Sequence, residues 1–226
     1  MKTLTLVIEL LSDALIGSGE GWGATIDSDI VFDELGLPYI PAKRIKGSLR
    51  DSATEVLEMF KKAGITNCFD LSREGTKREF KLINSTFGRP GQEAPSPIYC
   101  DNFYIPDYEN TRAWLEHLSE EYSSIITRDT VLSTFTYIRQ QTRINKDGIA
   151  EDYSLRTIRV IKKGNSFHGT ITIEDNSAVD LLNLTCKNLR RIGTKRTRGF
   201  GEVKCRLCEN DREINLSPKL EALCRA

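Results

Sequence analysis

Glycines and cations are interleaved in one short segment towards the C-terminal end of the sequence, residues 193–201. The segment holds three glycines and three basic residues: Gly193, Gly199, Gly201, Lys195, Arg196 and Arg198. Glycines allow backbone N–H groups to approach a phosphate closely, and cations neutralise its charge. The alternative is a glycine that ends a helix, followed by a bulge at the start of a strand. We interpret the segment as a phosphate-binding loop.

A second group of cations follows Pro41, where a segment with helical periodicity begins: Lys43, Arg44, Lys46 and Arg50. The start of a helix presents free N–H groups that attract anions, so cations there oppose the helix dipole. Gly47 lowers helix propensity but allows close approach of a ligand. An ordinary basic helix start is the alternative. We favour a second site for phosphate, and we expect Lys46–Arg50 and Lys195–Arg198 to converge in one cationic groove for a ribose-phosphate strand.

The charge distribution agrees with a polyanionic ligand although the formal net charge is zero, with 32 basic and 32 acidic residues. Between Lys187 and Arg206 the only acid is Glu202, whereas acids gather between residues 107 and 121. Segregated charge can steer a polyanion to one face of a neutral protein. A solvated helix face is the plainer explanation of each charged run.

Size and composition predict an ordinary globular domain of 226 residues, with 39% hydrophobic and 28% charged residues. No apolar run approaches the ~20 residues that span a membrane, so a soluble cytoplasmic protein without a membrane partner is expected. The six cysteines are expected to be reduced thiols. Cys205 and Cys208 are three apart in a predicted strand, where their side chains would face opposite sides, so we do not expect a zinc site.

The hydrophobic pattern predicts an α+β fold. Strands are expected at residues 2–11, 26–32, 37–40, 98–105, 166–174 and 199–208, and helices between Pro41 and Gly64, at 111–122 and at 177–192. Residues 135–144 and 149–161 flank the turn Asn145-Lys-Asp-Gly148 and should form a projecting hairpin. Residues 65–97 are interpreted as an insertion with a short helix near 78–86.

Without the insertions, the order strand, helix, strand, strand, helix, strand is the ferredoxin-like βαββαβ plan of the RNA-recognition motif. The aromatic signature with which that motif stacks bases is missing from this sequence. We therefore do not expect bases to stack on the sheet.

The two basic segments resemble those of the RAMP superfamily of CRISPR proteins, which share a Pro-x-x-x-Leu/Ile-Lys-Gly-x-x-Arg helix start and a C-terminal glycine-rich loop. The matching residues are Pro41, Ile45, Lys46, Gly47, Arg50 and the loop that ends in Arg198-Gly-Phe-Gly201. Residues 142–150 and 155–160 are similar to the thumb hairpin of type III backbone subunits, and Ser85–Arg89 resembles their Leu-Phe-Gly region.

This resemblance implies one RAMP domain over residues 1–226, with an insertion at about 65–97, a thumb hairpin at about 130–162 and the glycine-rich loop at 193–201. After the proline, Ala42-Lys43-Arg44 replaces the commoner Gly-Ser-Ser. The subtype of the type III effector complex therefore stays open, with subtype III-D as one option.

The resemblance also implies partners. They are a CRISPR guide RNA, the target RNA paired with it, copies of the same or related subunits in a filament, and other type III subunits. The expected RNA-binding residues are Lys43, Arg44, Lys46, Gly47, Arg50, Arg139, Arg143, Gly193, Lys195, Arg196, Arg198 and Gly199.

Members of the family that cut target RNA carry an aspartate ahead of the basic helix, in a pattern that residues 26–33 fit. The resemblance puts Asp27 at the catalytic position, with Asp29 as the alternate. A carboxylate with an ordinary pKa near ~4 is a weak base at neutral pH, so we expect it to orient a 2′-hydroxyl or to bind hydrated Mg²⁺. The chain is then a metal-dependent endoribonuclease active only in the assembled complex. Turn-forming aspartates are the alternative.

Two other functions stay open. The chain is a purely structural guide-binding subunit if Asp27 does not act in cleavage. A stand-alone endonuclease that processes repeat RNA would need a general base such as His117 or His168. Both histidines lie far from the basic segments in the sequence, and we expect them to be structural.

Overall fold

The computed structural model describes residues 1–17, 26–65, 82–88, 97–174 and 178–215. Its centre is a five-stranded sheet in the order β2-β5-β1-β6-β7, with antiparallel neighbours. The strands are β1 (Lys2–Leu10), β2 (Ile98–Cys100), β5 (Ser166–Ile173), β6 (Val203–Glu209) and β7 (Arg212–Glu213). Side chains of β1 alternate across the sheet, so Leu4, Leu6, Ile8 and Leu10 are buried.

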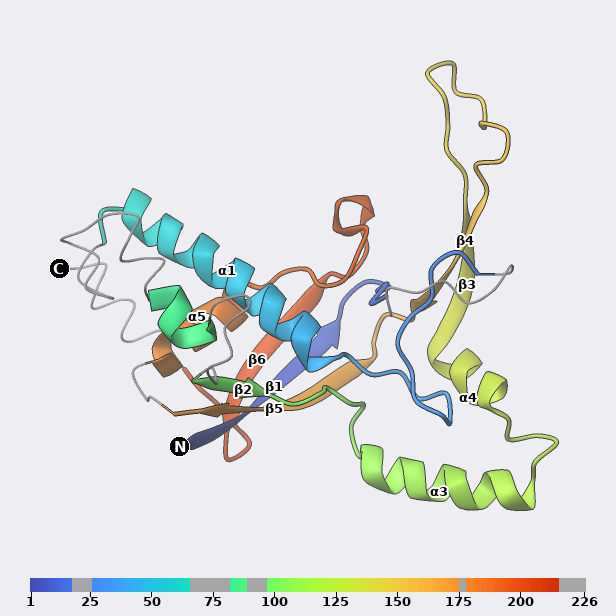
Figure 1. Cartoon of the computed structure of the whole chain (residues 1–226), viewed down its shortest axis with the longest axis horizontal. Coiled ribbons are helices and arrows are strands. Elements are labelled where there is room, and N and C mark those ends of the chain that lie inside the picture. Colours follow the sequence, from blue (N-terminus) through green and yellow to red (C-terminus); the bar gives the residue numbers. More distant parts are fainter. Residues whose placement is uncertain (18–25, 66–81, 89–96, 175–177, 216–226) are drawn as a thin grey trace.

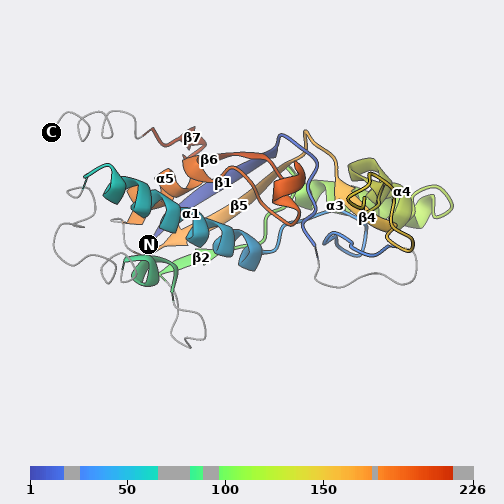
Figure 2. The same cartoon turned by 90° about the horizontal axis from the view of Figure 1, so that it is seen from above.

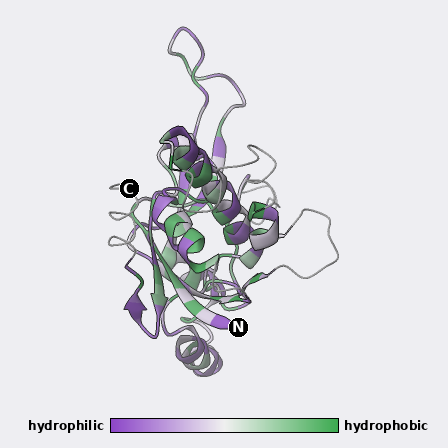
Figure 3. Cartoon of the chain, turned by 90° about the vertical axis from the view of Figure 1, so that its left-hand side faces the viewer, coloured by the Kyte–Doolittle hydropathy of each residue, from purple (hydrophilic) through white to green (hydrophobic). Residues whose placement is uncertain are grey.

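Two helices, α1 (Ala42–Lys62) and α5 (Ala178–Asn188), lie side by side on the sheet (Figures 1 and 2). The apolar positions of α1 recur at three- and four-residue spacing, which buries Ile45, Leu49 and Ala53. The hydroxyl of Ser52 donates to the Thr185 carbonyl at 2.9 Å and links the two helices. Figure 3 shows hydrophobic residues gathered where the helices meet the sheet.

The chain order β1, α1, β2, β5, α5, β6 and the spatial order of these strands confirm the predicted ferredoxin-like βαββαβ core. Large segments join β2 to β5. They form α3 (Tyr108–Glu121), α4 (Arg128–Phe135) and a hairpin of β3 (Thr136–Gln141) with β4 (Arg156–Ile161). Within the described ranges, no helix is long and apolar enough to cross a membrane.

The hairpin and its tip, residues 136–161, project from the body of the molecule, and we call them the arm (Figure 1). Beyond the two strands, Ile144 pairs with Ala150 around the turn at 145–148, as the sequence predicted. Side chains near the tip are exposed, and an arm with so little buried surface depends on its base for its position.

Several predicted elements were wrong in kind or extent. Residues 26–32 and 37–40 are not regular strands but irregular chain with single pairings, such as Phe32 with Pro38. The predicted strand at 98–105 ends at Cys100, α5 ends at Asn188 and β6 begins only at Val203. The helix α4 was missed, although Thr127 and Thr130 form a capping box at its start.

Part of the predicted insertion and of its short helix lies outside the described residues, as do Cys68 and Cys224. The described part of that helix, residues 82–87, is helical.

Candidate nucleic-acid interface

The glycine-rich loop, residues 193–201, is fixed at both ends to the chain that follows β1. The N–H of Thr194 donates to the Leu15 carbonyl at 2.9 Å, and the N–H of Gly201 donates to the Asp13 carbonyl at 2.8 Å. Gly201 has φ +72°, and a side chain there would overlap the Ile192 carbonyl oxygen. Between these anchors, Arg196 and Arg198 belong to an exposed turn of 3₁₀ helix.

The base of the arm lies against this loop. Lys195 donates a hydrogen bond to the Gln141 side chain at the end of β3. Arg139 sits over the ring of Phe200, with its guanidinium 5.3 Å from the ring centroid, and 3.4 Å from an oxygen of Asp13. The predicted RNA-binding residue Arg139 therefore lies at the base of the arm and helps to attach it to the loop.

A groove runs between the arm and the loop, with a volume of about 860 Å³. We call it the arm groove. Four cations line it from three parts of the chain, the tip of the arm, the start of β4 and the loop: Arg143, Arg156, Lys195 and Arg198. Glu151 and Asp152 are its acidic residues, and Glu151 is 3.4 Å from Arg143. The cations outnumber the acids, so the groove is suited to a phosphate chain.

Asp27 lies beside β4. One carboxylate oxygen accepts the N–H of Thr157 at 2.7 Å, and the other pairs with the Arg156 guanidinium at 2.9 Å. The Thr157 N–H and Arg156 hold the pKa of Asp27 below its usual range. Partial burial and the charge of Arg198 lower the pKa of Lys195, whereas the charge of Asp27 raises it. Asp27 is thus an exposed anion within electrostatic reach of the cations of the groove.

Asp29, the alternate candidate, is buried, with 1% of its surface exposed. Its oxygens bind the N–H of Ile30 at 2.7 Å and the Arg159 guanidinium at 2.9 Å. Such a buried ion pair holds the chain before α1 against β4 and leaves Asp29 little access to a ligand. The two aspartates therefore differ in environment although they are two residues apart.

The residues around Asp27 do not make a metal site by themselves. Over the residues that the structure describes, no group of three histidine, cysteine or acidic side chains is placed to hold an ion. Both oxygens of Asp27 already accept hydrogen bonds from Arg156 and Thr157, and its other charged neighbour is Lys195. Mg²⁺ prefers several oxygen ligands, so this donor set does not fit a magnesium ion held by the protein.

Two basic residues of α1, Lys46 and Arg50, contact other parts of the chain than the basic residues of the glycine-rich loop do. Lys46 donates to the Ile98 carbonyl at 3.1 Å, and partial burial lowers its pKa. Arg50 donates to the Gly88 carbonyl and to Asn84. We expected these two cations to meet Lys195 and Arg198 in one groove, but Lys46 contacts β2 and Arg50 contacts the segment 82–88.

Other predicted residues of this cluster are more accessible. Lys43 is exposed on the first turn of α1, and Arg44 reaches the Gly17 carbonyl at 3.3 Å. Gly47 is exposed, with open space where a side chain would lie, so it leaves room for a ligand without being required by packing. Gly193 and Gly199 both have positive φ, of +79° and +81°, which shapes the loop.

Among the residues that line the groove, sequence patterns missed Arg156 and Gln141, which contact Asp27 and Lys195. Arg156 was not singled out because nothing in the sequence relates it to Asp27, and Gln141 is one of two adjacent glutamines. The alternation of the arm strands could have shown which side chains share a face, but not which face meets the loop.

The two histidines and the four cysteines that the structure describes do not line the groove. His117 lies on α3, 3.7 Å from Glu121, and His168 on β5, where partial burial and Arg206 lower its pKa. Burial raises the pKa of the Cys205 thiol to about 12, so it stays protonated at neutral pH. Cys208 is only half-buried, so Cys205 and Cys208 lie in different environments.

Comparison with known proteins gives a family. The family model described as the RAMP superfamily matches residues 7–204. No curated protein matches the sequence significantly. Among solved structures, the fold is similar to a chain in the cryo-EM structure of the Type III-B Cmr-beta bound to cognate target RNA. The TM-score is 0.62 at 15% identity, over 92% of this chain and 97% of the other.

A chain in the apo-state cryo-EM structure of Type III-B Cmr-beta is similar too, with a TM-score of 0.60 at 14% identity. That match covers 92% of this chain and 98% of the other. At these identities the structural likeness concerns the fold, whereas the family match extends over most of the sequence. The chain belongs to the RAMP superfamily.

Proposed function

We propose that the chain is a guide-RNA-binding backbone subunit of a type III CRISPR ribonucleoprotein, a complex of antiviral defence. The observation that carries this proposal is the arm groove, in which cations from the arm and from the glycine-rich loop face one cavity. The similarity to chains of Type III-B Cmr-beta, one of them bound to target RNA, supports it over nearly the whole length.

In this proposal the guide backbone crosses the exposed cations of the loop and of the first turn of α1. Arg196, Arg198 and Lys43 contact phosphates directly, and the glycines let the strand approach the backbone. Lys46 and Arg50 act more by holding the carbonyl groups of Ile98 and Gly88 than as phosphate contacts. Copies of the chain follow one another along the guide, and each arm reaches towards the target strand.

We further propose that Asp27 serves cleavage of the target RNA. Its low pKa makes it a poor base, but an ionised carboxylate can accept a hydrogen bond from a 2′-hydroxyl and orient it. The 2′-oxygen attacks the adjacent phosphorus, and the bond from phosphorus to the 5′-oxygen breaks. The products are a 2′,3′-cyclic phosphate and a 5′-hydroxyl that takes up the proton. Arg156 beside Asp27 counters the charge that develops on the phosphate.

Magnesium enters the proposal as an ion carried by the RNA. Because the described side chains offer no set of ligands, RNA phosphates and water would supply most of its coordination, with Asp27 as one protein oxygen at most.

The test is a complex assembled from all its subunits with guide RNA, target RNA and Mg²⁺. Replacing Asp27→Asn keeps the size of the side chain and removes its charge. We expect the rate of target cleavage to be abolished while the amount of bound guide is unchanged. If the Asp27→Asn complex cleaves target RNA at the rate of the wild type, Asp27 has no role in cleavage. Loss of guide binding in a Lys195→Ala, Arg198→Ala variant tests the RNA-binding part separately.

A specific observation favours a second candidate, the non-catalytic guide-binding subunit. Both oxygens of Asp27 are engaged by Arg156 and Thr157, an arrangement that also suits an anchor for the arm. In that case the Asp27→Asn complex and the wild type both leave the target intact with Mg²⁺, while guide RNA still binds in a salt-sensitive manner.

A further inference from the structure

A second cavity lies away from the arm groove and shares no lining residue with it. It has a volume of about 470 Å³, within the range of small-ligand sites. Its walls come from the turn after Phe32, the chain between β2 and α3, and the starts of α3 and α4. The cavity contains four aromatic rings, two arginines and an asparagine: Phe32, Tyr39, Tyr104, Tyr108, Arg112, Arg128 and Asn102.

Three of the rings form a stack. Tyr104 lies between Tyr39, with centroids 5.7 Å apart and planes at 29°, and Tyr108, at 4.2 Å and 26°. Each end ring keeps one face that Tyr104 does not cover. All three tyrosines are half-buried, and Tyr108 packs against the hydrophobic core, so the stack is only partly open to solvent. A planar ligand can extend such a stack without rearranging it.

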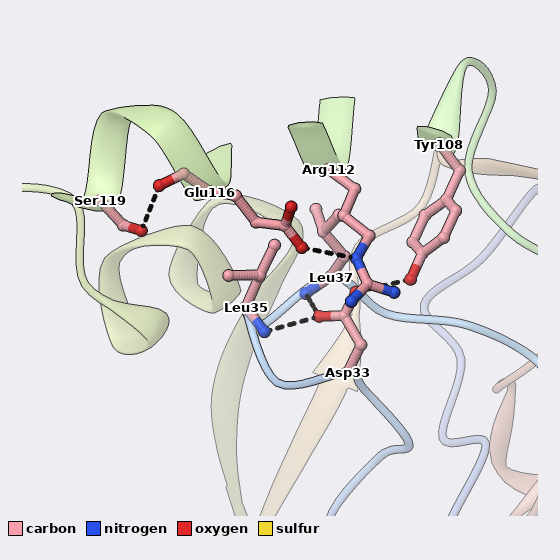
Figure 4. A network of polar contacts seen from close by, with 7 residues as sticks. All are labelled: Asp33, Leu35, Leu37, Tyr108, Arg112, Glu116 and Ser119. Carbon is pink, nitrogen blue, oxygen red and sulfur yellow. Dashed lines mark hydrogen bonds and ion pairs between the residues drawn. The ribbon is translucent and has the colours of Figure 1, made fainter. Parts of the chain in front are cut away.

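Two acids line the cavity: Glu34 is exposed, whereas Asp33 has both carboxylate oxygens occupied by hydrogen bonds. Asp33 accepts the N–H groups of Leu35 and Leu37 at 3.0 and 2.8 Å, and the Tyr108 hydroxyl at 2.9 Å (Figure 4). Partial burial and the bond to Asp33 raise the pKa of Tyr108 to about 12, so this hydroxyl stays a donor. Asp33 thus fixes the turn and the ring without offering a free carboxylate.

The cations lie at the edge of the stack. Arg112 points between Tyr108 and Glu116, which binds its Nε at 2.9 Å (Figure 4). The guanidinium of Arg128 lies 4.7 Å above the ring of Phe32. A guanidinium has five N–H donors in a flat fork, so the contacts of Arg112 with Glu116 and Tyr108 leave it further donors for a phosphate. Among the described residues, the Nδ2 group of Asn102 contacts Tyr104 at 3.4 Å, and an amide has a second N–H that can donate to a base edge.

We propose that this cavity binds one unpaired nucleotide, with the base on an end ring of the tyrosine stack and the phosphate between Arg112 and Arg128. The combination of stacked rings, a flanking amide and two guanidinium groups matches how proteins hold single unstacked nucleotides. This proposal goes beyond the proposed function, because it depends neither on the arm groove nor on Asp27.

The test uses the full chain and adenosine 5′-monophosphate, with binding followed by ligand-observed NMR. Wild type binds, and adenosine without its phosphate binds more weakly. Tyr39→Ala weakens binding roughly tenfold or more, as expected for loss of a base-stacking contact. Arg112→Gln, on the exposed side of α3 and thus less of a risk to folding, weakens nucleotide binding but not adenosine binding.

Matched controls lie outside the cavity. Tyr99 is 40% exposed on β2 and Arg212 is exposed on β7, so Tyr99→Ala and Arg212→Gln leave binding unchanged. The bound nucleotide could belong to an RNA strand or be a free mononucleotide, and a pentaadenylate strand distinguishes the two. If the protein binds pentaadenylate more tightly than adenosine 5′-monophosphate, the ligand is part of an RNA strand. Equal affinity indicates a free nucleotide. The strand is tested in the Lys195→Ala, Arg198→Ala background to keep the arm groove out of the measurement.

Absence of mononucleotide binding to the wild type, or equal binding by wild type and the Tyr39 and Arg112 variants, overturns the proposal. These outcomes leave the arm groove untouched. Conversely, if the Lys195→Ala, Arg198→Ala protein binds long RNA as the wild type does, the proposed function fails while the nucleotide site stands.

Discussion

Asp27 and Arg156 form a 2.9 Å ion pair although 129 residues separate them in the sequence. The pair joins the irregular chain before α1 to the first residue of β4. It is reinforced by the Asp27 N–H, which donates to the Thr157 carbonyl at 2.8 Å. Any movement of the arm at its base therefore changes the surroundings of the one carboxylate that we propose for cleavage.

Arg156 is expected to matter for cleavage and little for assembly. In the assembled complex, Arg156→Ala should lower the single-turnover rate of target cleavage about 10²-fold, because it removes a charge beside the reacting phosphate. The cleavage rate of Arg156→Lys should lie between those of the wild type and Arg156→Ala, since lysine keeps the charge but not the planar fork of the guanidinium. The amount of bound guide should stay within about twofold. Arg212→Ala, outside the groove, is the control, and an Arg156→Ala complex as fast as this control rejects the role.

Substitutions of Asp27 and Asp29 should have different effects on the stability of the protein. Asp29→Asn leaves Arg159 without its buried partner, and we expect the free energy of unfolding to fall by about 3 kcal/mol. Asp27→Asn changes an exposed pair, so the denaturation midpoint should hardly move. Chemical denaturation of the two purified variants makes the comparison. Equal midpoints would contradict the structural role of Asp29.

Two glycines of the loop provide a matched pair. Gly199 and Gly201 both have left-handed backbones, with φ +81° and +72°, but an added methyl group meets open space at Gly199 and the Ile192 carbonyl at Gly201. Gly199→Ala should lower the free energy of unfolding by about 1 kcal/mol. Gly201→Ala should lower it by about 2 kcal/mol more, through steric overlap. Thermal unfolding measures both, and a smaller loss at Gly201 would show that the loop is not packed as described.

The pH dependence of RNA binding should reflect the protonation state of Lys195. Its pKa is lowered, chiefly by partial burial, so the ammonium loses its proton as the pH rises towards a value below the ordinary ~10.4 of lysine. RNA affinity should therefore weaken above neutral pH at constant salt, and recover on return to pH 7. Arginine stays charged over this range, so Lys195→Arg should remove this part of the loss. Filter binding at a series of pH values checks it; identical profiles of wild type and Lys195→Arg count against Lys195 as a phosphate contact.

Much of the hydrophobic core could be predicted from the sequence, because the patterns that indicate burial are local. The alternation of residues 2–11 and the helical spacing of Ile45, Leu49 and Ala53 report burial directly, and the ferredoxin-like order follows from them. The irregular chain before Pro41 was less predictable. There, carboxylates of Asp29 and Asp33 bind backbone N–H groups that a strand would have paired, so apolar residues did not form a ladder.

The sequence by itself determined which residues carry charge and where three segments lie: the glycine-rich loop, the basic start of α1 and the turn of the arm. Only the tertiary structure decided how these charges are used. It buried Asp29, left Asp27 exposed beside Arg156, and turned Lys46 and Arg50 towards the carbonyls of Ile98 and Gly88 instead of towards Lys195. The reason is that each of these contacts joins residues far apart in the sequence: 129 and 130 positions for the two aspartates, 52 for Lys46 and 38 for Arg50. They depend on how distant segments pack, which no local periodicity encodes.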